Sequence, residues 1–258
     1  MEAVTKMNYL YDQSFEGFLT CVYHHWYTEK ADGIFSESDS YQLDLSRFAT
    51  TVETDVDKAD RVLAAIYNKL SKWDAQRVYQ AFCSTVPEKE MKLLRYLALG
   101  FKNGSKIRLL HGDPIVKAVE AAERIVGLEV HRLTGLIRFS EKMDTSSGVL
   151  LLYSKIEPDN DVLEFLAPHF SDRYKNEPFI IHDLRREKAL LALGGEWEIA
   201  SLEIETEASA YNKTENETEY ASLWKQYFGI MATKERINPK CQRNFMPHRY
   251  WKHLTEIS

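Results

Sequence analysis

The chain has 258 residues, with 33 basic and 39 acidic side chains and a formal net charge of −6. This length is enough for one large domain or two closely packed ones, and a hydrophobic content of 44% is ordinary for a soluble globular protein. We recognise neither a secretory leader nor an apolar run of about 18 residues, and therefore expect no membrane span. The three cysteines are far apart in the sequence, which predicts a cytoplasmic protein without a disulfide framework or a structural zinc site.

The first half of the chain is expected to be mostly helical. A short strand at residues 7–11 is expected to precede the first helix, and residues 31–40 have the composition of a polar loop. Asp113 followed by Pro114 is typical of a helix start, because aspartate caps the first turn and proline fits its first position. Apolar side chains at helical spacing predict helices at residues 15–27, 55–70, 73–84, 88–101 and 113–133.

From about residue 136 the apolar periodicity changes to that of strands. A helix predicted at residues 161–174 lies between these strands. The order strand, strand, helix and three strands favours an antiparallel sheet backed by helices over a parallel sheet. We predict the strands at residues 136–139, 149–156, 179–183, 189–193 and 197–204.

The sequence therefore predicts an α+β fold, in which a helical N-terminal half packs against an antiparallel sheet and a C-terminal helix closes the structure. We expect a mostly helical region at residues 1–130. A sheet region with a basic, aromatic C-terminal segment is expected at residues 131–258. The two regions should pack tightly, either as two domains or as one.

Residues 220–257 differ from the rest of the chain in charge and pattern. Residues 224–253 contain four lysines and three arginines but only one acid, Glu235. A basic, aromatic-rich end on an acidic protein indicates either contact with a phosphate-bearing partner or a solvated basic face. Helical spacing predicts an amphipathic helix docked on a core, with Tyr220, Leu223, Trp224, Tyr227, Phe228 and Met231 on its apolar face.

The same segment carries a resemblance to a known family. The run KERINPKCQRNFMPHRYWKHLTE, with the pattern ERxNPxxQxxxMPxRYWxxLxE, resembles the C-terminal signature of an uncharacterised bacterial family labelled as DNA metabolism or DNA repair proteins. Three further blocks resemble that family's central motifs: HRLTGLIRF (131–139), KIEPDNDVLEFLAPHFSDRY (155–174) and FIIHDLRR (179–186). Together the blocks extend the resemblance over roughly residues 90–257.

The resemblance implies a setting but no reaction. Members of that family are encoded beside a radical-SAM protein, and related domains occur fused to uracil-DNA glycosylase. This chain contains neither the CxxxCxxC motif of a radical-SAM enzyme nor a glycosylase motif. The resemblance therefore implies a DNA-metabolism factor that works with a radical-SAM partner, and no base-excision activity is transferred to it.

Polar side chains are concentrated on the apolar elements of the central block. Arginine suits bidentate contact with phosphate, so one interpretation is a phosphate-binding surface made by Arg138, Arg173 and Arg186. A second is an acid/base or metal group formed by His169, His182 and Asp183. A third interpretation is internal ion pairing, in which Glu157, Asp172 or Asp183 holds Arg173 and Arg186.

Our leading hypothesis is a DNA-metabolism or DNA-repair accessory protein that binds nucleic acid through its basic C-terminal segment. The alternatives are an enzyme acting on nucleic acid or a nucleotide, with candidate catalytic residues His169, His182, Asp183 and Arg186, or a protein-interaction scaffold. We expect no metal and no cofactor. Whether Tyr250 and Trp251 stack on bases or fill the core stays open. The candidate nucleic-acid-binding residues are Arg138, Arg173, Arg236, Asn238, Lys240, Gln242, Arg243, Arg249 and Lys252.

Overall fold

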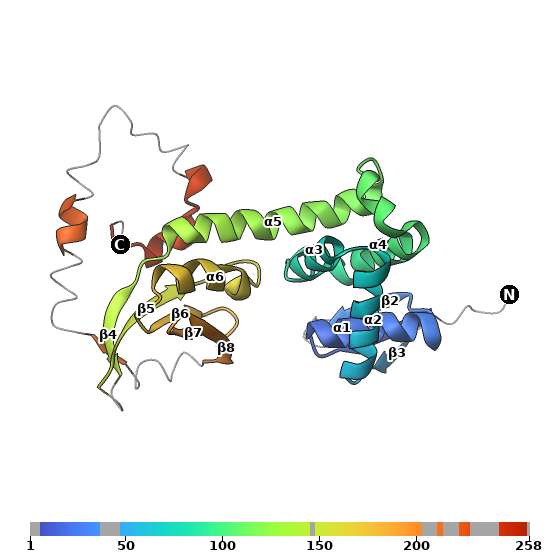
Figure 1. The fold of residues 1–258 in the computed structure, drawn as a ribbon, viewed down its shortest axis with the longest axis horizontal. Coiled ribbons are helices and arrows are strands. Elements are labelled where there is room, and N and C mark those ends of the chain that lie inside the picture. The colour runs from blue at the N-terminus through green and yellow to red at the C-terminus, as the bar shows by residue number, and fades with distance from the viewer. Residues whose placement is uncertain are drawn as a thin grey trace. The chain divides into compact units, whose positions relative to one another are not determined.

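The computed structural model describes residues 6–36, 47–144, 148–202, 211–213, 222–227 and 243–256 (Figure 1). The chain divides into two compact units, Met1–Gly127 and Leu128–Ser258, which we call the N-terminal and the C-terminal unit. The division falls within the long helix α5, Pro114–Leu136. The predicted α+β class is confirmed, since helices dominate the N-terminal unit and a large sheet forms the C-terminal unit. Among the described residues, no helix combines the length and the apolar character needed to cross a membrane.

The N-terminal unit contains a three-stranded parallel sheet in the order β2-β1-β3. Its strands are β1 (Lys6–Tyr11), β2 (Gly33–Ser36) and β3 (Arg47–Thr51). The prediction of a loop at residues 31–40 is therefore wrong in part, because residues 33–36 form β2. Because β2 has only four residues and begins with glycine, it has no readable alternation, and its pairing with β1 determines its structure.

The other elements of the N-terminal unit are helices, and most of them were predicted from their periodicity. Ser14, Asp55 and Ser71 each accept a hydrogen bond from a backbone N–H in the first turn of the following helix, which fixes where that helix begins. The helices are α1 (Phe15–Tyr27), α2 (Val56–Lys69), α3 (Lys72–Phe82), α4 (Lys89–Asn103), the 3-10 helix η1 (Gly104–Leu109) and the first part of α5.

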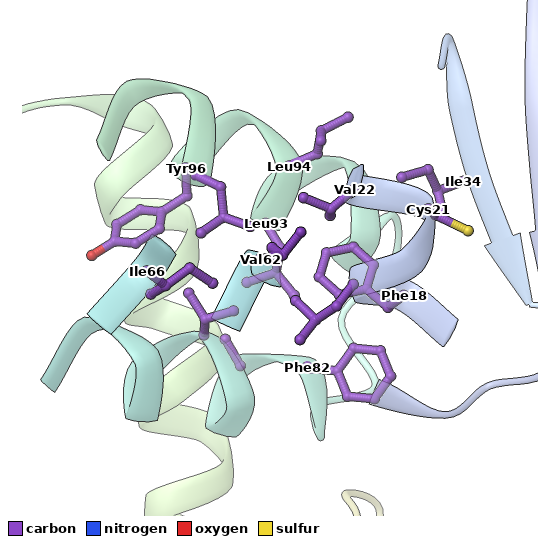
Figure 2. Packing of buried hydrophobic residues seen from close by; sticks show 14 of the residues in the cluster. Phe18, Cys21, Val22, Ile34, Val62, Ile66, Phe82, Leu93, Leu94 and Tyr96 are labelled. Carbon is purple, nitrogen blue, oxygen red and sulfur yellow. The ribbon is translucent and has the colours of Figure 1, made fainter. Parts of the chain in front are cut away.

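Buried apolar side chains from α1 to α4, together with residues of β1, β2, η1 and the first part of α5, form the core of the N-terminal unit. The ring of Phe18 stacks on that of Phe82, with centroids 5.6 Å apart. Polar groups in this core are paired, as where the Tyr96 hydroxyl donates to Asp74 over 2.9 Å. Burying each large apolar side chain contributes roughly 1.5–3 kcal/mol to folding. Figure 2 shows part of this cluster, including Phe18, Val22, Val62, Ile66, Phe82, Leu93 and Tyr96.

The C-terminal unit is built on a six-stranded sheet in the order β8-β7-β6-β5-β4-β9. Four neighbouring pairs are antiparallel, as predicted, but β5 and β6 are parallel. The helix α6 (Leu163–Arg173) lies between β5 and β6 in the chain and returns it to the same end of the sheet, so the two strands run in one direction. The strands are β4 (Ser140–Asp144), β5 (Leu150–Ile156), β6 (Phe179–Asp183), β7 (Lys188–Leu193), β8 (Glu196–Ser201) and β9 (Tyr211–Lys213).

The strand expected at residues 136–139 is wrong. Helix α5 continues to Leu136, and the backbone N–H of Ile137 still donates to the carbonyl of Leu133 over 3.0 Å. Leu133 and Ile137 are both buried, so they extend the apolar stripe of α5, and the first strand begins only at Ser140. A short 3-10 helix, η3 (His248–His253), closes the C-terminal end.

Candidate nucleic-acid interface

A groove of about 930 Å³ opens in the C-terminal unit, lined by the end of α5, the end of α6 and the helical segment 222–227. Two of the predicted nucleic-acid-binding residues, Arg138 and Arg173, line it. Aromatic rings make up much of the remaining wall, namely those of Phe139, Tyr174, Trp224 and Tyr227. Alternating cations and aromatic rings are typical of surfaces that bind single-stranded nucleic acid.

Phe139 anchors this wall to the body of the unit. Its ring packs edge-on against Phe170, Tyr174 and Phe179, with centroids 5.6, 5.0 and 5.8 Å away. These contacts join the segment after α5 to α6 and β6. The Tyr174 side of the groove is therefore held by packed rings, so a base could stack there without rearranging the unit.

Arg138 is held by an acid on one side of the groove. Its Nη2 lies 2.7 Å from Oε1 of Glu256, and its guanidinium lies 5.7 Å from the centre of the Trp224 ring. Trp224 Nε1 also donates to Glu256, over 3.0 Å. Burial alone would raise the pKa of Glu256, but these hydrogen bonds more than offset it and hold that pKa below its ordinary value. The ionised Glu256 therefore holds both Arg138 and Trp224 in place.

Arg173 is exposed and lies over an aromatic ring. Its guanidinium is 5.6 Å from the centre of the Tyr174 ring. The ion pairs formed among the described residues engage Arg138, Arg185 and Arg186, but not Arg173. Glu177, also exposed, is an acid in the same groove. Within the described part of the chain, Arg173 is therefore the lining cation whose charge is not matched by an ion pair.

The segment 222–227 is helical, as the spacing predicted, but its apolar side chains do not fill a core. Leu223, Trp224 and Tyr227 are 52%, 39% and 53% exposed. The rings of Trp224 and Tyr227 stack with centroids 5.7 Å apart and planes 30° apart. The prediction of a docked core helix is therefore wrong for these residues, because helical spacing identifies an apolar face without showing what covers it.

Two of the predicted C-terminal contacts are ion-paired inside the unit. Arg249 Nη1 lies 2.7 Å from Asp159 Oδ2, and Lys252 Nζ lies 2.6 Å from Glu157 Oε1. A phosphate contact at either residue stays a prediction, and it would require these pairs to open. Arg243 is exposed at the start of a short helical stretch. Arg236, Asn238, Lys240 and Gln242 lie outside the described residues.

A buried carboxylate that the sequence analysis missed organises this region. Glu129 of α5 is 2% exposed and accepts hydrogen bonds from the backbone N–H groups of Asp159 and Asn160. The Tyr250 hydroxyl and Arg249 Nη2 donate to it as well. Burial would raise the pKa of Glu129, but the hydrogen bonds from Tyr250, Asp159 and Asn160 more than offset it and lower that pKa. One signal was available, since Glu129 falls on the buried stripe of α5 with Ala122, Val126 and Leu133.

Tyr250 itself is 2% exposed, so it fills the core. Trp251, its neighbour, is partly buried, and its Nε1 donates to the carbonyl of Met246 over 2.9 Å. The aromatic residues of η3 therefore act mainly in packing the C-terminal end against the unit.

The candidate catalytic residues are mostly buried in paired arrangements. His182 is 0% exposed, and its Nε2 lies 2.9 Å from the carbonyl of Leu202. Because a carbonyl only accepts, Nε2 carries a proton, and Nδ1 forms a hydrogen bond with the Tyr153 hydroxyl over 2.6 Å. A buried ring that is hydrogen-bonded at both nitrogens is typical of a structural histidine. His169, by contrast, is exposed on α6.

Asp183 and Arg186 form the internal pair that the sequence analysis gave as one alternative. Arg186 Nη1 lies 2.9 Å from Asp183 Oδ2, and Asp183 is 0% exposed. Burial raises the pKa of Asp183, while the hydrogen bond from Arg186 opposes that shift. Within the described ranges, no group of three His, Cys, Asp or Glu side chains is arranged to hold a metal ion.

Comparison with known proteins identifies a family without identifying an activity. The family DUF4130, described as a domain of unknown function, matches residues 87–256. No curated protein matches the chain. The matched region contains the groove, the Glu129 carboxylate and the Asp183–Arg186 pair. Because the match covers well over half of the sequence, this chain belongs to the DUF4130 family.

Proposed function

We propose that the C-terminal unit binds single-stranded nucleic acid in the groove lined by Arg173, Tyr174, Trp224 and Tyr227. The observation that carries this proposal is the exposed, stacked pair of Trp224 and Tyr227 in the same groove as Arg173. A base can stack on the open aromatic faces, while the guanidinium of Arg173 contacts a phosphate.

A single strand suits the groove better than a duplex. Bases in a duplex are already stacked on one another, so their faces cannot reach an aromatic side chain. The aromatic rings lie inside a groove of about 930 Å³, where an unstacked base can enter. The groove also contains the acid Glu177, which repels phosphates. We therefore expect the phosphates to lie near Arg173 and away from Glu177.

Arg138 has a positioning role in this proposal. Arg138 is paired with Glu256, so that carboxylate compensates a large part of the arginine's charge. Glu256 also accepts a hydrogen bond from Trp224 Nε1. The effect of Arg138 on binding would come from holding the Trp224 ring in place. The exposed Arg243 and the predicted Arg236, Asn238, Lys240 and Gln242 would extend the contact along the basic C-terminal segment.

The sequence resemblance supplies the biological setting of the proposal. Resemblance to DNA metabolism and DNA repair proteins supports DNA as the nucleic acid, and the gene neighbourhood of that family supports a radical-SAM protein as partner. The chain would then be an accessory factor that holds a single strand for that partner. The buried, hydrogen-bonded state of His182 favours this binding role over catalysis at His182 and Asp183.

The test is fluorescence anisotropy with a labelled single-stranded oligonucleotide and a matched duplex, at several salt concentrations. Trp224→Ala should cost about 1–3 kcal/mol of binding free energy, because it removes one stacking surface. Arg173→Ala should weaken binding and reduce the salt slope by about one. Glu177→Gln should strengthen binding, since it removes an acid from the groove.

Matched controls are Trp73→Ala and Arg95→Ala, both at exposed positions in the N-terminal unit. Neither should change the affinity. Wild-type affinity in both Trp224→Ala and Arg173→Ala, with folding intact, would rule out the groove as the binding site.

A further inference from the structure

A second pocket lies in the N-terminal unit, on elements that the proposal above does not use. It has a volume of about 390 Å³ and is lined by residues of α1, α2 and α4. Its floor includes Val22 and Val62, which belong to the buried core (Figure 2). A pocket of this size lies at the lower end of the range for small-molecule sites, so it suits a ligand of one or two rings.

The walls of this pocket are aromatic. Trp26 is 40% exposed, and its ring packs edge-on against Phe101 with centroids 5.4 Å apart. Tyr27 is 75% exposed, and its ring stacks on Tyr23 with centroids 4.5 Å apart and planes 29° apart. These rings are positioned by one another, so their open faces are available to a planar ligand at small entropic cost.

Two cations on α2 complete the pocket. Arg61 and Lys69 both line it, and they are two helical turns apart on one face of the helix. Lys69 Nζ lies 5.7 Å from the centre of the Phe101 ring. Ion pairs among the described residues of this unit engage Lys58 and Arg77, but neither Arg61 nor Lys69. Of the residues that line the pocket, these two are the charged ones and both are cations, so the pocket offers positive charge beside an apolar floor.

We infer that this pocket binds a nucleotide, with the base against Trp26 and Tyr27 and the phosphate at Arg61 and Lys69. A nucleotide joins a planar base, which matches the aromatic walls, to a negatively charged phosphate, which matches the two cations. The nucleotide could be free or part of a single strand. This site lies in the N-terminal unit and does not rest on the groove proposed above.

The test is calorimetric titration of the full chain carrying Arg173→Ala and Trp224→Ala, so that the C-terminal groove makes no contribution. Thymidine monophosphate, thymidine and inorganic phosphate are compared as ligands. The monophosphate should bind at least about tenfold more tightly than either thymidine or phosphate, because only it engages both the rings and the cations. Adding Arg61→Ala should lower the affinity for the monophosphate about tenfold and leave the affinity for thymidine unchanged. Adding Arg95→Ala should change neither affinity.

A second arm identifies the source of the nucleotide. A short oligothymidylate that binds, while the free monophosphate does not, would assign the site to a strand, provided that Arg61→Ala weakens that binding. Monophosphate binding that is unaffected by both Arg61→Ala and Trp26→Ala would overturn the inference. So would the absence of binding by both ligands, or binding of an acidic aromatic peptide in their place. These titrations use the chain in which the C-terminal groove is already disabled, so a failure of the proposed groove would not change their outcome. The two proposals can therefore be tested separately.

Discussion

The carboxylate of Glu129 on α5 accepts a hydrogen bond from the hydroxyl of Tyr250 on η3, and both side chains are 2% exposed. The same carboxylate accepts from the backbone of residues 159 and 160. One buried charge therefore joins three segments of the C-terminal unit that are distant in the sequence. Buried carboxylates persist only when donors replace their lost water, and here the donors come from all three segments.

We predict that Glu129→Gln lowers the free energy of unfolding by about 3 kcal/mol. The substitution removes the charge that balances Arg249 and turns an amide N–H₂ group toward donors that need an acceptor. Urea unfolding followed by circular dichroism measures the change. Glu198→Gln, at an exposed position on β8, is the matched control and should stay within about 0.5 kcal/mol of wild type. Equal effects of the two substitutions would contradict a central role for Glu129.

Stability should fall in acid because of carboxylates whose pKa is lowered in the folded state. For Glu129, burial acts to raise the pKa, but hydrogen bonds led by that of Tyr250 bring it below the ordinary value of 4.5. A lowered folded pKa adds stability that is fully present above pH 4.5 and is lost as pH falls toward the folded pKa. Asp183, whose pKa is raised by burial, contributes in the opposite direction.

The measurement is the urea midpoint between pH 7 and pH 3 for wild type and Glu129→Gln. The urea midpoint of the wild type should stay constant above about pH 4.5 and fall below that pH. The variant should show a shallower loss, because the titrating group has been removed, while the contribution of Asp183 is common to both proteins. Parallel curves for the two proteins would show that Glu129 does not carry the acid sensitivity.

Two arginines of the C-terminal unit should respond differently to salt. Arg173→Ala is expected to reduce the slope of log affinity against log salt by about one, because it removes a phosphate contact. Arg249→Ala should leave that slope unchanged but destabilise the unit, since Arg249 is paired with Glu129 and Asp159. Anisotropy titrations and urea unfolding of both variants separate the two effects. A reduced slope in Arg249→Ala would instead show that Arg249 leaves its ion pairs to contact a phosphate.

Gly17→Ala should destabilise the N-terminal unit although alanine favours helices. A Cβ at this position of α1 would lie 2.3 Å from Oδ1 of Asp12 and 2.8 Å from Oγ1 of Thr54. Those short side chains are hydrogen-bonded to each other over 2.8 Å and have little room to move. We expect a loss of about 1–3 kcal/mol in thermal or urea unfolding.

Gly135→Ala on α5 is the matched control for this prediction. Nothing lies within 4 Å of the Cβ that it would add. It should raise the stability of the chain by up to about 1 kcal/mol, because alanine replaces glycine inside a helix. A stabilising Gly17→Ala would show that the Asp12 and Thr54 side chains can move aside.

The sequence by itself determined most of the helices and the α+β class. Apolar spacing and capping residues are local signals, and Ser14, Asp55 and Ser71 act as caps where the periodicity indicated a helix start. Strands with a clear apolar run, such as β5 and β6, were also predicted close to their observed bounds. Arg138 and Arg173 could be selected as candidates because of their residue type.

Only the tertiary structure decided which side chains meet. Strand β2 and the parallel β5–β6 pair depend on pairing between segments, which leaves no periodic trace in either segment. Helical spacing gave Trp224 and Tyr227 a shared face, but burial depends on what lies opposite, and they are exposed in a groove with Arg173. Likewise, Arg249 carries the same charge as Arg173 in the sequence. Arg249 is paired with the buried carboxylate of Glu129, which is far from it in the sequence. The folded position of that acid, and not the residue type, therefore determines which arginine remains available to a ligand.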